Sequence, residues 1–298
     1  MSTILFLETP ENFSFQHTIR SHGWSGLLPF EINEANSSLT YVFRDGVNVP
    51  VAATIKQEKG KLKIEVEGSE NVPANLLRDV RHMLRLDDNM AEFYDVIDKE
   101  AAFAWVSAAN AGRLLRSPTV FEDLVKTLCT TNCSWGATTK MVTNLVEKLG
   151  VPSASGKRAF PTPEVLARVP EQFFRDEIRA GYRSAYFAEM AELIASGRLD
   201  PEVWLHSELP TPELRKEIKK VKGFGDYAAD NLLKLLGRYD GLALDSWLRA
   251  GFFKKHNGEK PCTDVKIEKH YKKYGKWKGL AMWCDMTEKW FEENSIQQ

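Results

Sequence analysis

Gly223-Phe224-Gly225 separates two helical patterns, and this tripeptide constrains the fold more than any other stretch of the sequence. Residues 213–221 carry apolar side chains at positions i, i+4 and i+7, with lysines elsewhere, which predicts an amphipathic helix. Residues 227–236 predict a second helix that ends at a glycine. A pair of helices joined by a very tight turn is therefore expected.

The expected turn has the chemistry of a phosphate site. Glycine reaches positive φ at little steric cost, so backbone N–H groups can face outward at the start of the second helix, where Asp226 is expected to be the cap. The neighbouring Lys219, Lys220 and Lys222 add positive charge. Together these groups predict a site for an anionic phosphate without sequence preference. The alternative is an ordinary helix pair whose glycines serve packing only.

The spacing between the glycine turn and a following aspartate is a second informative feature of the sequence. Residues 242–244 are apolar and lead to Asp245, about twenty residues beyond Gly225, at the start of a third predicted helix. This arrangement resembles the helix-hairpin-helix superfamily of DNA glycosylases, in particular 3-methyladenine glycosylase II and the 8-oxoguanine glycosylases. The resemblance implies that Asp245 is the catalytic carboxylate, whereas the simpler interpretation is a helix N-cap. The proline that often stands two residues before the family's aspartate is Ala243 here.

Length and composition indicate a globular protein. The 298 residues are 43% hydrophobic, which is ample for a buried core. No leader-like start or membrane-length apolar run is present, so the expected location is cytoplasmic, near the nucleoid in a bacterium or nuclear in a eukaryote. The four cysteines, Cys129, Cys133, Cys262 and Cys284, form no CxxC pair, which argues against a zinc site or an iron-sulfur cluster.

Charge is distributed unevenly along the chain. The net charge is only −1, but residues 213–278 hold 17 Lys and Arg against 9 Asp and Glu. Residues 1–212 carry the opposite excess, about six negative charges. A basic C-terminal half with interleaved aromatic residues is expected of a phosphate-binding surface, although lysine-rich surfaces are often only solvated.

The predicted fold class is α+β, a mainly helical helix-hairpin-helix core with a small N-terminal antiparallel sheet and helix. Segments 39–44, 47–55 and 61–67 read as a meander, with turns at Asp45-Gly46 and at 58–60, and 73–86 reads as a helix. We expect an N-terminal domain at 1–95 and a helical core at 96–298 in two subdomains. The helix-hairpin-helix itself is expected at 213–237.

Two further segments are similar to DNA-contacting parts of the family. The expected helix 119–129 is broken by polar residues 130–135 before a helix over 137–149. The resemblance implies that Asn132 fills the gap left by an extruded nucleotide, and the alternative is a helix-capping asparagine. Tyr182 and Arg183 resemble the segment that wedges the opposite strand. The alternative for Tyr182 is a core aromatic.

The expected chemistry is hydrolysis of an N-glycosidic bond. Bifunctional relatives have a lysine where this chain has Tyr227, and an aromatic ring cannot form an imine, so a monofunctional enzyme is predicted. A ring also suits a cationic alkylated purine such as 3-methyladenine through cation–π attraction. Oxidised guanine or a deaminated base is the alternative substrate. The candidate residues of the base pocket are Tyr227, Asn231, Trp135, Met282 and Met286.

The expected partner is double-stranded DNA that contains a damaged base, bound by a monomer with no membrane association. Hydrolysis requires no cofactor. The resemblance implies an optional monovalent cation, Na⁺ or K⁺, held by the backbone carbonyls of Lys219, Val221 and Phe224. A rival from another class is a non-catalytic module that binds DNA through the hairpin and senses distortion.

Overall fold

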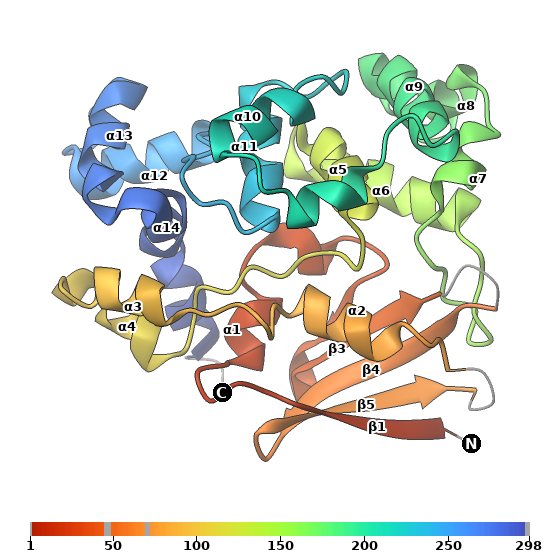
Figure 1. Ribbon diagram of the computed structural model, residues 1–298, viewed down its shortest axis with the longest axis horizontal. Helices are drawn as coiled ribbons and strands as arrows, with labels where there is room; N and C mark the ends of the chain where they lie inside the picture. The colour runs from red at the N-terminus through yellow and green to blue at the C-terminus, as the bar shows by residue number, and fades with distance from the viewer. Residues whose placement is uncertain (1, 45–48, 69–71, 296–298) are drawn as a thin grey trace.

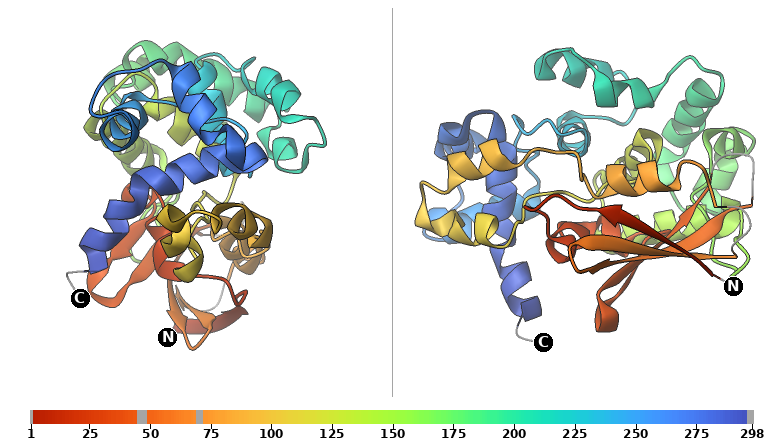
Figure 2. Two further views of the ribbon diagram at one scale, coloured as in Figure 1. Left: turned by 90° about the vertical axis from the view of Figure 1, so that its left-hand side faces the viewer. Right: turned by 60° about the horizontal axis from the view of Figure 1, so that its bottom comes forward.

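The computed structural model describes residues 2–44, 49–68 and 72–295, with side chains described as far as residue 290. Five strands form one antiparallel sheet in the order β1-β5-β4-β3-β2. Their bounds are β1 Ser2–Glu8, β2 Glu31–Asn33, β3 Ser38–Phe43, β4 Val51–Glu58 and β5 Lys61–Glu67. Figures 1 and 2 show this sheet as one layer with the helices gathered on one side of it.

The predicted meander is confirmed in β3, β4 and β5. Alternation along β5 buries Leu62, Ile64 and Val66 completely and turns the intervening lysines and glutamates outward, as expected for a strand with one wet face. Lys59 and Gly60 both adopt positive φ in the turn that joins β4 to β5. The predicted turn at Asp45-Gly46 lies outside the described residues.

The rest of the chain is mostly helical, as predicted. The helices that follow or flank the sheet are α1 Phe15–Ile19, α2 Leu76–Met83, α3 Ala91–Ile97 and α4 Ala104–Ala108. The central group is α5 Val120–Thr130, α6 Trp135–Leu149, α7 Pro163–Ala167, α8 Glu171–Asp176 and α9 Ser184–Ala195. The last group is α10 Thr211–Ile218, α11 Asp226–Leu235, α12 Ser246–His256, α13 Asp264–Tyr271 and α14 Lys278–Ser295. Short 3-10 helices include η4 Gly181–Arg183 and η5 Pro201–His206.

Two large hydrophobic clusters, with a small third one of Val42, Ala52 and Ala159, make the core of the described residues. The larger one joins the inner face of the sheet to α2, α5 and the helices up to α11. The smaller one joins α3 and α4 to α12, α13 and α14. Buried Arg85 links the parts: its Nε donates to the carbonyl of Leu114 at 2.8 Å and its Nη2 to that of Lys234 at 2.9 Å. The sheet and the helices are therefore packed against each other as one body.

The predicted helix-hairpin-helix is present as α10 and α11, and Gly237 ends the second helix at φ +86°. One expectation for the hairpin is wrong: Asp226 does not cap α11. Gly225 occupies the N-cap position, with no side-chain hydrogen bond there. Asp226 forms ion pairs with Lys219 at 2.5 Å and Arg215 at 3.0 Å instead.

Among the described residues, we find no helix whose length and hydropathy would allow it to cross a membrane.

Candidate active site

A cavity of about 990 Å³ brings together three of the residues that the sequence singled out. Tyr227 reaches it from the start of α11, Asp245 from the start of α12, and Asn132 from the turn after α5. These elements lie side by side in the upper half of Figure 1. Residues separated by more than one hundred positions in the sequence thus share one concave site.

Asp245 is both an N-cap and a cavity residue. Its backbone is extended, at φ −117°, and one carboxylate oxygen accepts a hydrogen bond from the backbone N–H of Leu248 at 2.7 Å. Among the described residues, the other oxygen has no hydrogen-bond or ion-pair partner. The cap fixes the orientation of the carboxylate at the N-terminus of α12, and leaves one oxygen available to a molecule in the cavity.

Two features fix the loop that leads to Asp245: a positive φ at Ala243 and a close backbone contact at Gly279. Ala243 adopts φ +51°, an uncommon conformation for a residue with a side chain. Gly279, at the start of α14, donates its N–H to the carbonyl of Tyr239 at 2.7 Å. A Cβ at position 279 would stand 2.1 Å from the carbonyl oxygen of Gly241, so only glycine permits this approach.

Tyr227 and Lys234 share one face of α11, because they are seven residues apart. Burial, followed by the charge of Asp245, raises the pKa of the half-buried Tyr227. Burial lowers the pKa of Lys234 to about 8, although Asp245 acts in the opposite direction. The carboxylate of Asp245 therefore acts electrostatically on both side chains.

Lys234 was not predicted from the sequence as a site residue. Its side chain is only 3% exposed and forms no ion pair or hydrogen bond in the described part of the chain. Its Nζ lies 5.4 Å from the ring centroid of Trp283, whose indole N–H donates to the carbonyl of Ser21 at 2.8 Å. The ring of Trp247, from α12, lies 6.0 Å from that of Trp283. The one sign of the buried amine in the sequence is that a lone lysine stands on the apolar stripe of 227–236.

Asn132 and Tyr182 lie together at the surface. Asn132 has φ +45°, and its side-chain amide lies 3.4 Å from the hydroxyl of the 51%-exposed Tyr182. Ser134, and not Asn132, caps α6. Exposure thus excludes the core alternative for Tyr182, and the cap geometry excludes the capping alternative for Asn132.

Arg183 differs from its expected position. It is buried, with its guanidinium 4.6 Å from the ring centroid of Tyr182 and its Nε donating to the hydroxyl of Thr131 at 3.0 Å. The expectation that Arg183 contacts DNA stays a prediction, and in this structure little of its side chain is exposed. The residue supports Tyr182 from beneath and joins it to the end of α5.

The other candidate pocket residues are dispersed. Asn231 donates to the carbonyl of Tyr227 at 2.9 Å, within α11. Trp135 is 48% exposed and covers Gly23, where an added Cβ would meet its ring. Met282 is fully buried and Met286 packs on Gly251, and their place in the base pocket stays a prediction. Neither methionine lines the cavity of Asp245.

The hairpin presents open backbone groups. Gly223 adopts φ +91°, and a Cβ there would stand 2.7 Å from Leu128, whereas Gly225 has φ −82° and open space around it. Because α11 has no side-chain cap, its first N–H groups are available to an anion. Lys220 and Lys222 pair with Glu217 and Glu189 at 2.5 and 2.6 Å, both at the surface. Such pairs are weak enough for a phosphate to replace.

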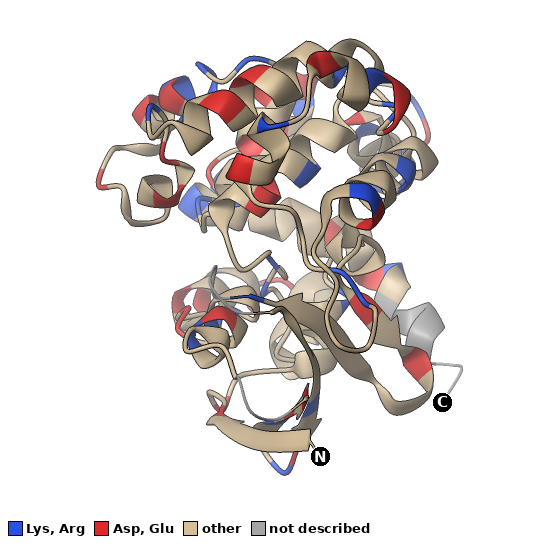
Figure 3. Cartoon of the chain, turned by 90° about the vertical axis from the view of Figure 1, so that its right-hand side faces the viewer, with Lys and Arg blue, Asp and Glu red and all other residues tan. Residues whose placement is uncertain are grey.

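The cavity itself is less basic than the flanking sequence. Its charged lining comprises six acidic and three basic residues, namely Asp226, Asp230, Asp240, Asp245, Asp264, Glu268, Arg215, Arg249 and Lys278. Figure 3 likewise shows Lys and Arg interspersed with Asp and Glu over the helices. The excess of positive charge in 213–278 therefore lies outside the cavity.

Two places have ligands that a cation could use. The carbonyl of Val221 accepts one hydrogen bond, from Phe224, whereas those of Lys219 and Phe224 accept no backbone hydrogen bond from the described loop residues. These three oxygens fit the chemistry of a monovalent cation. His256, His270 and Asp285 place ligand atoms within 4.8 Å of one another. There the carboxylate is already engaged by Lys255, His256 and Tyr271.

Comparison with known proteins finds two relatives that are both named as glycosylases. A probable N-glycosylase/DNA lyase of Methanothermobacter thermautotrophicus is 22% identical over 251 residues, covering 76% of this chain and 78% of that protein. A putative DNA-3-methyladenine glycosylase of Bacillus subtilis is 21% identical over 222 residues, covering 72% and 75%.

Solved structures share the fold. The 8-oxoguanine glycosylase/lyase of Clostridium acetobutylicum, without ligand, has a TM-score of 0.74 at 19% identity, covering 96% of this chain and 97% of that one. The 3-methyladenine DNA-glycosylase of Archaeoglobus fulgidus has a TM-score of 0.75 at 16% identity, covering 97% and 99%. The family described as HhH-GPD superfamily base excision DNA repair protein matches residues 125–293, more than half of the chain. With its hairpin, the following aspartate and this match, the chain belongs to the HhH-GPD superfamily of base excision DNA repair proteins.

Proposed function

We propose that the protein is a monofunctional DNA N-glycosylase that uses Asp245 to hydrolyse the bond between a flipped, damaged base and its deoxyribose. The observation that carries this proposal is the half-buried Asp245 in a cavity with Tyr227 and Asn132, with one carboxylate oxygen unengaged among the described residues. A base inside a duplex is inaccessible, so the nucleotide has to be extruded at a cost of a few kcal/mol.

Each group has a role in this proposal. The open N–H groups of α11 and the surface lysines bind the backbone phosphates. Asn132 and Tyr182 occupy the space left in the duplex. As the glycosidic bond breaks, positive charge develops on the sugar, and the Asp245 carboxylate stabilises it and orients or deprotonates the attacking water. A monovalent cation at the carbonyls of Lys219, Val221 and Phe224 would add positive charge near the bound phosphate.

Asp245→Asn tests the catalytic role. Asparagine caps helices as well as aspartate does, so the fold and DNA binding are expected to persist while alkali-labile abasic product falls by at least 100-fold. The matched control is Asp240→Asn, which changes a second carboxylate of the same cavity. Product formation at the wild-type rate by Asp245→Asn would contradict the assignment. No product from the wild type on any lesion would support the non-catalytic alternative.

A panel of duplexes, each with one damaged base, also tests for lyase activity. With Tyr227 in the position of the family's nucleophilic lysine, borohydride should trap no covalent protein–DNA adduct. A trapped adduct that disappears in Lys234→Met would assign the amine of Lys234 as the nucleophile and would overturn the monofunctional proposal.

For the lesion we propose an alkylated purine such as 3-methyladenine, because the aromatic ring of Tyr227 lines the same cavity as Asp245. One observation favours a second candidate, a neutral oxidised or deaminated base. Lys234 is a buried amine beside Trp283, and no counter-ion stands by it among the side chains that the structure describes. When protonated it repels a cationic base and donates hydrogen bonds to a carbonyl oxygen of a neutral one.

Lys234→Met separates the two substrates, since methionine has a similar length and no charge. If alkylated purines are the substrate, the variant should excise 7-methylguanine or 3-methyladenine at least as fast as the wild type. If the neutral base is the substrate, excision of 8-oxoguanine or hypoxanthine should fall by about tenfold or more, the effect of one lost hydrogen bond to a charged group. Single-turnover rates on matched duplexes measure both.

A further inference from the structure

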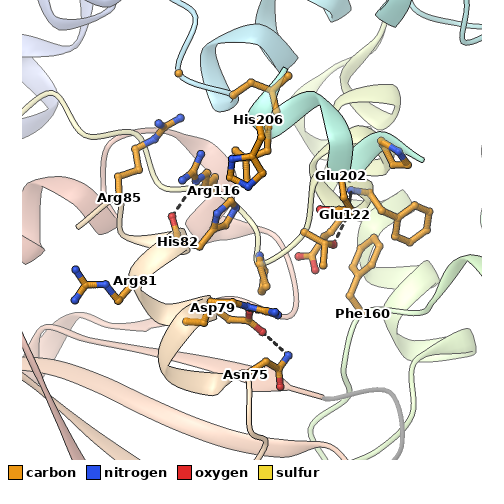
Figure 4. A pocket seen from close by; sticks show the side chains of 18 of the residues that line it. Asn75, Asp79, Arg81, His82, Arg85, Arg116, Glu122, Phe160, Glu202 and His206 are labelled. Carbon is orange, nitrogen blue, oxygen red and sulfur yellow. Dashed lines mark hydrogen bonds and ion pairs between the residues drawn. The ribbon is translucent and has the colours of Figure 1, made fainter. Parts of the chain in front are cut away.

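A second cavity, of about 1250 Å³, lies between the sheet and the helices (Figure 4), and Asp245 is not among its lining residues. It is lined by β3, α2, η5 and the first residues of α5, together with Leu236 and Gly237 after α11. Thr130 at the end of α5 and Tyr227, Asp230 and Leu233 of α11 line the cavity of Asp245 instead. No described residue lines both cavities, although Tyr239 and Trp277 of this one directly precede Asp240 and Lys278 of the other.

The carboxylates that line this second cavity all have partners. Asp79, Asp87 and Asp88 each pair with an arginine. Glu122 accepts the hydroxyl of Tyr41 at 2.6 Å and pairs with Lys126 at 2.7 Å. The remaining two cap backbone N–H groups: Asp200 that of Glu202, and Glu202 those of Val120 and Phe121. Each carboxylate is thus already engaged, while the lining as a whole, with six carboxylates and five arginines, has no excess of positive charge.

Several donors, by contrast, have no acceptor. The Nε2 of His82 is buried and has no hydrogen-bond partner in the described part of the chain. Arg116 donates from Nε to the carbonyl of His82 at 2.8 Å and from Nη1 to that of Leu235 at 3.3 Å, while its Nη2 has no partner among the described residues. The ring of exposed His206 also has none there. Figure 4 shows His82, Arg116 and His206 converging on one region of the cavity.

The electrostatics of this region favour an anion. Burial, reinforced by Arg116, Arg85, Arg78 and His206, lowers the pKa of His82 to about 2. Burial and the charge of Arg85 lower the pKa of Arg116 to about 10, so its guanidinium is still charged at neutral pH. A neutral imidazole N–H and a guanidinium end together suit the oxygen atoms of a phosphate.

Aromatic side chains stand among the aliphatic and polar residues of the rest of the wall. Phe43, Phe121, Phe160, Tyr239 and Trp277 line the cavity beyond the cationic region. The flat ring of a ligand can stack on the face of an aromatic side chain, and the volume of this cavity exceeds what a small organic ligand requires. We propose that this cavity binds a nucleoside monophosphate, with its phosphate on Arg116, His82 and His206 and its base against the aromatic wall. None of these residues lines the cavity of Asp245.

Calorimetric titration of the full chain with adenosine 5′-monophosphate tests the proposal, with inorganic phosphate and adenosine as parallel probes. The nucleotide should bind more tightly than phosphate, and adenosine most weakly. His206→Ala and His82→Gln should each weaken nucleotide binding by about tenfold, whereas Arg175→Gln, at an exposed position on α8, should not. Circular dichroism confirms that each variant is folded, and the wild type alone decides the outcome should one fail to fold.

A second readout identifies the place of binding. Because a bound phosphate offsets the surrounding positive charge, the pKa of His82, followed by NMR of its ring nitrogens, should rise on addition of the nucleotide. Duplex DNA should not displace the nucleotide. The proposal is overturned if the folded wild type does not bind the nucleotide, if the His82 ring does not respond, or if DNA competes, which would assign these donors to the DNA surface.

Discussion

At the scale of single residues, the two hairpin glycines have different physical roles. Gly223 is required by the protein itself: it has φ +91°, and a Cβ would collide with Leu128 and Tyr186. Gly225 has an ordinary φ and no atom within 4 Å of an added Cβ. Open space beside the uncapped start of α11 is what the close approach of a phosphate needs.

Alanine at each position should therefore give opposite results. Gly223→Ala should lower the free energy of unfolding by about 2 kcal/mol, the combined effect of strain and overpacking. Gly225→Ala should change it by less than about 1 kcal/mol, yet weaken binding to an abasic duplex by roughly tenfold. Urea unfolding and fluorescence anisotropy measure the two effects. Equal losses of stability would contradict this division of roles.

The same scale shows what the sequence could predict. Asp245, Tyr227 and Asn132 share a cavity as expected, because motif spacing along neighbouring helices carries that information. Arg183 and Lys234 were out of reach, since their burial depends on packing against Tyr182 and Trp283 from other elements. Met282 was expected near the base and is in the core, the usual place for methionine.

At the scale of elements, the existence of helices and strands was predictable and their ends were not. The helix expected over 213–221 ends at Ile218, because Lys220 and Val221 donate to carbonyls three residues back and tighten the last turn. β1 was not predicted, since its pairing of Ser2 with Glu67 joins the two ends of the sheet region. Such long-range pairing leaves little trace in local sequence. The domain boundary expected at residue 95 stays a prediction.

The loop before α12 gives a prediction at this scale. Ala243 stands where relatives often have proline, but its φ of +51° is incompatible with a proline ring, which fixes φ near −65°. Ala243→Pro should cost about 3 kcal/mol or more of unfolding free energy and displace Asp245, with loss of excision activity. Ala243→Gly, the matched control, should stay within about 1 kcal/mol of the wild type, because glycine accepts positive φ. Thermal unfolding separates the two, and a stable Ala243→Pro protein would refute the argument.

At the scale of the whole molecule, the C-terminal helices are held by one buried carboxylate. Asp285 of α14 is 5% exposed and meets His256 at 2.6 Å and Lys255 at 2.8 Å, both from α12, and the hydroxyl of Tyr271 from α13 at 2.5 Å. Burial alone would raise the pKa of Asp285, but these hydrogen bonds outweigh it and lower the pKa to about 2. Asp285 thereby joins α14 to α13 and to α12, the helix that begins after Asp245. These three helices contribute to the smaller core cluster.

This network makes global stability depend on pH in a definite direction. A carboxyl whose folded pKa lies below its unfolded value stabilises the fold above the unfolded pKa, near 4, and this contribution is lost as pH falls toward 2. Asp285→Asn should therefore be less stable than the wild type by about 2 kcal/mol at pH 6, and the difference should shrink toward pH 2. Glu268→Gln, an exposed surface pair with Lys278, is the control and should show little difference at any pH. Chemical unfolding followed from pH 6 to pH 2 gives the comparison, and a gap that stays constant across this range would mean that Asp285 contributes through shape and not through its charge.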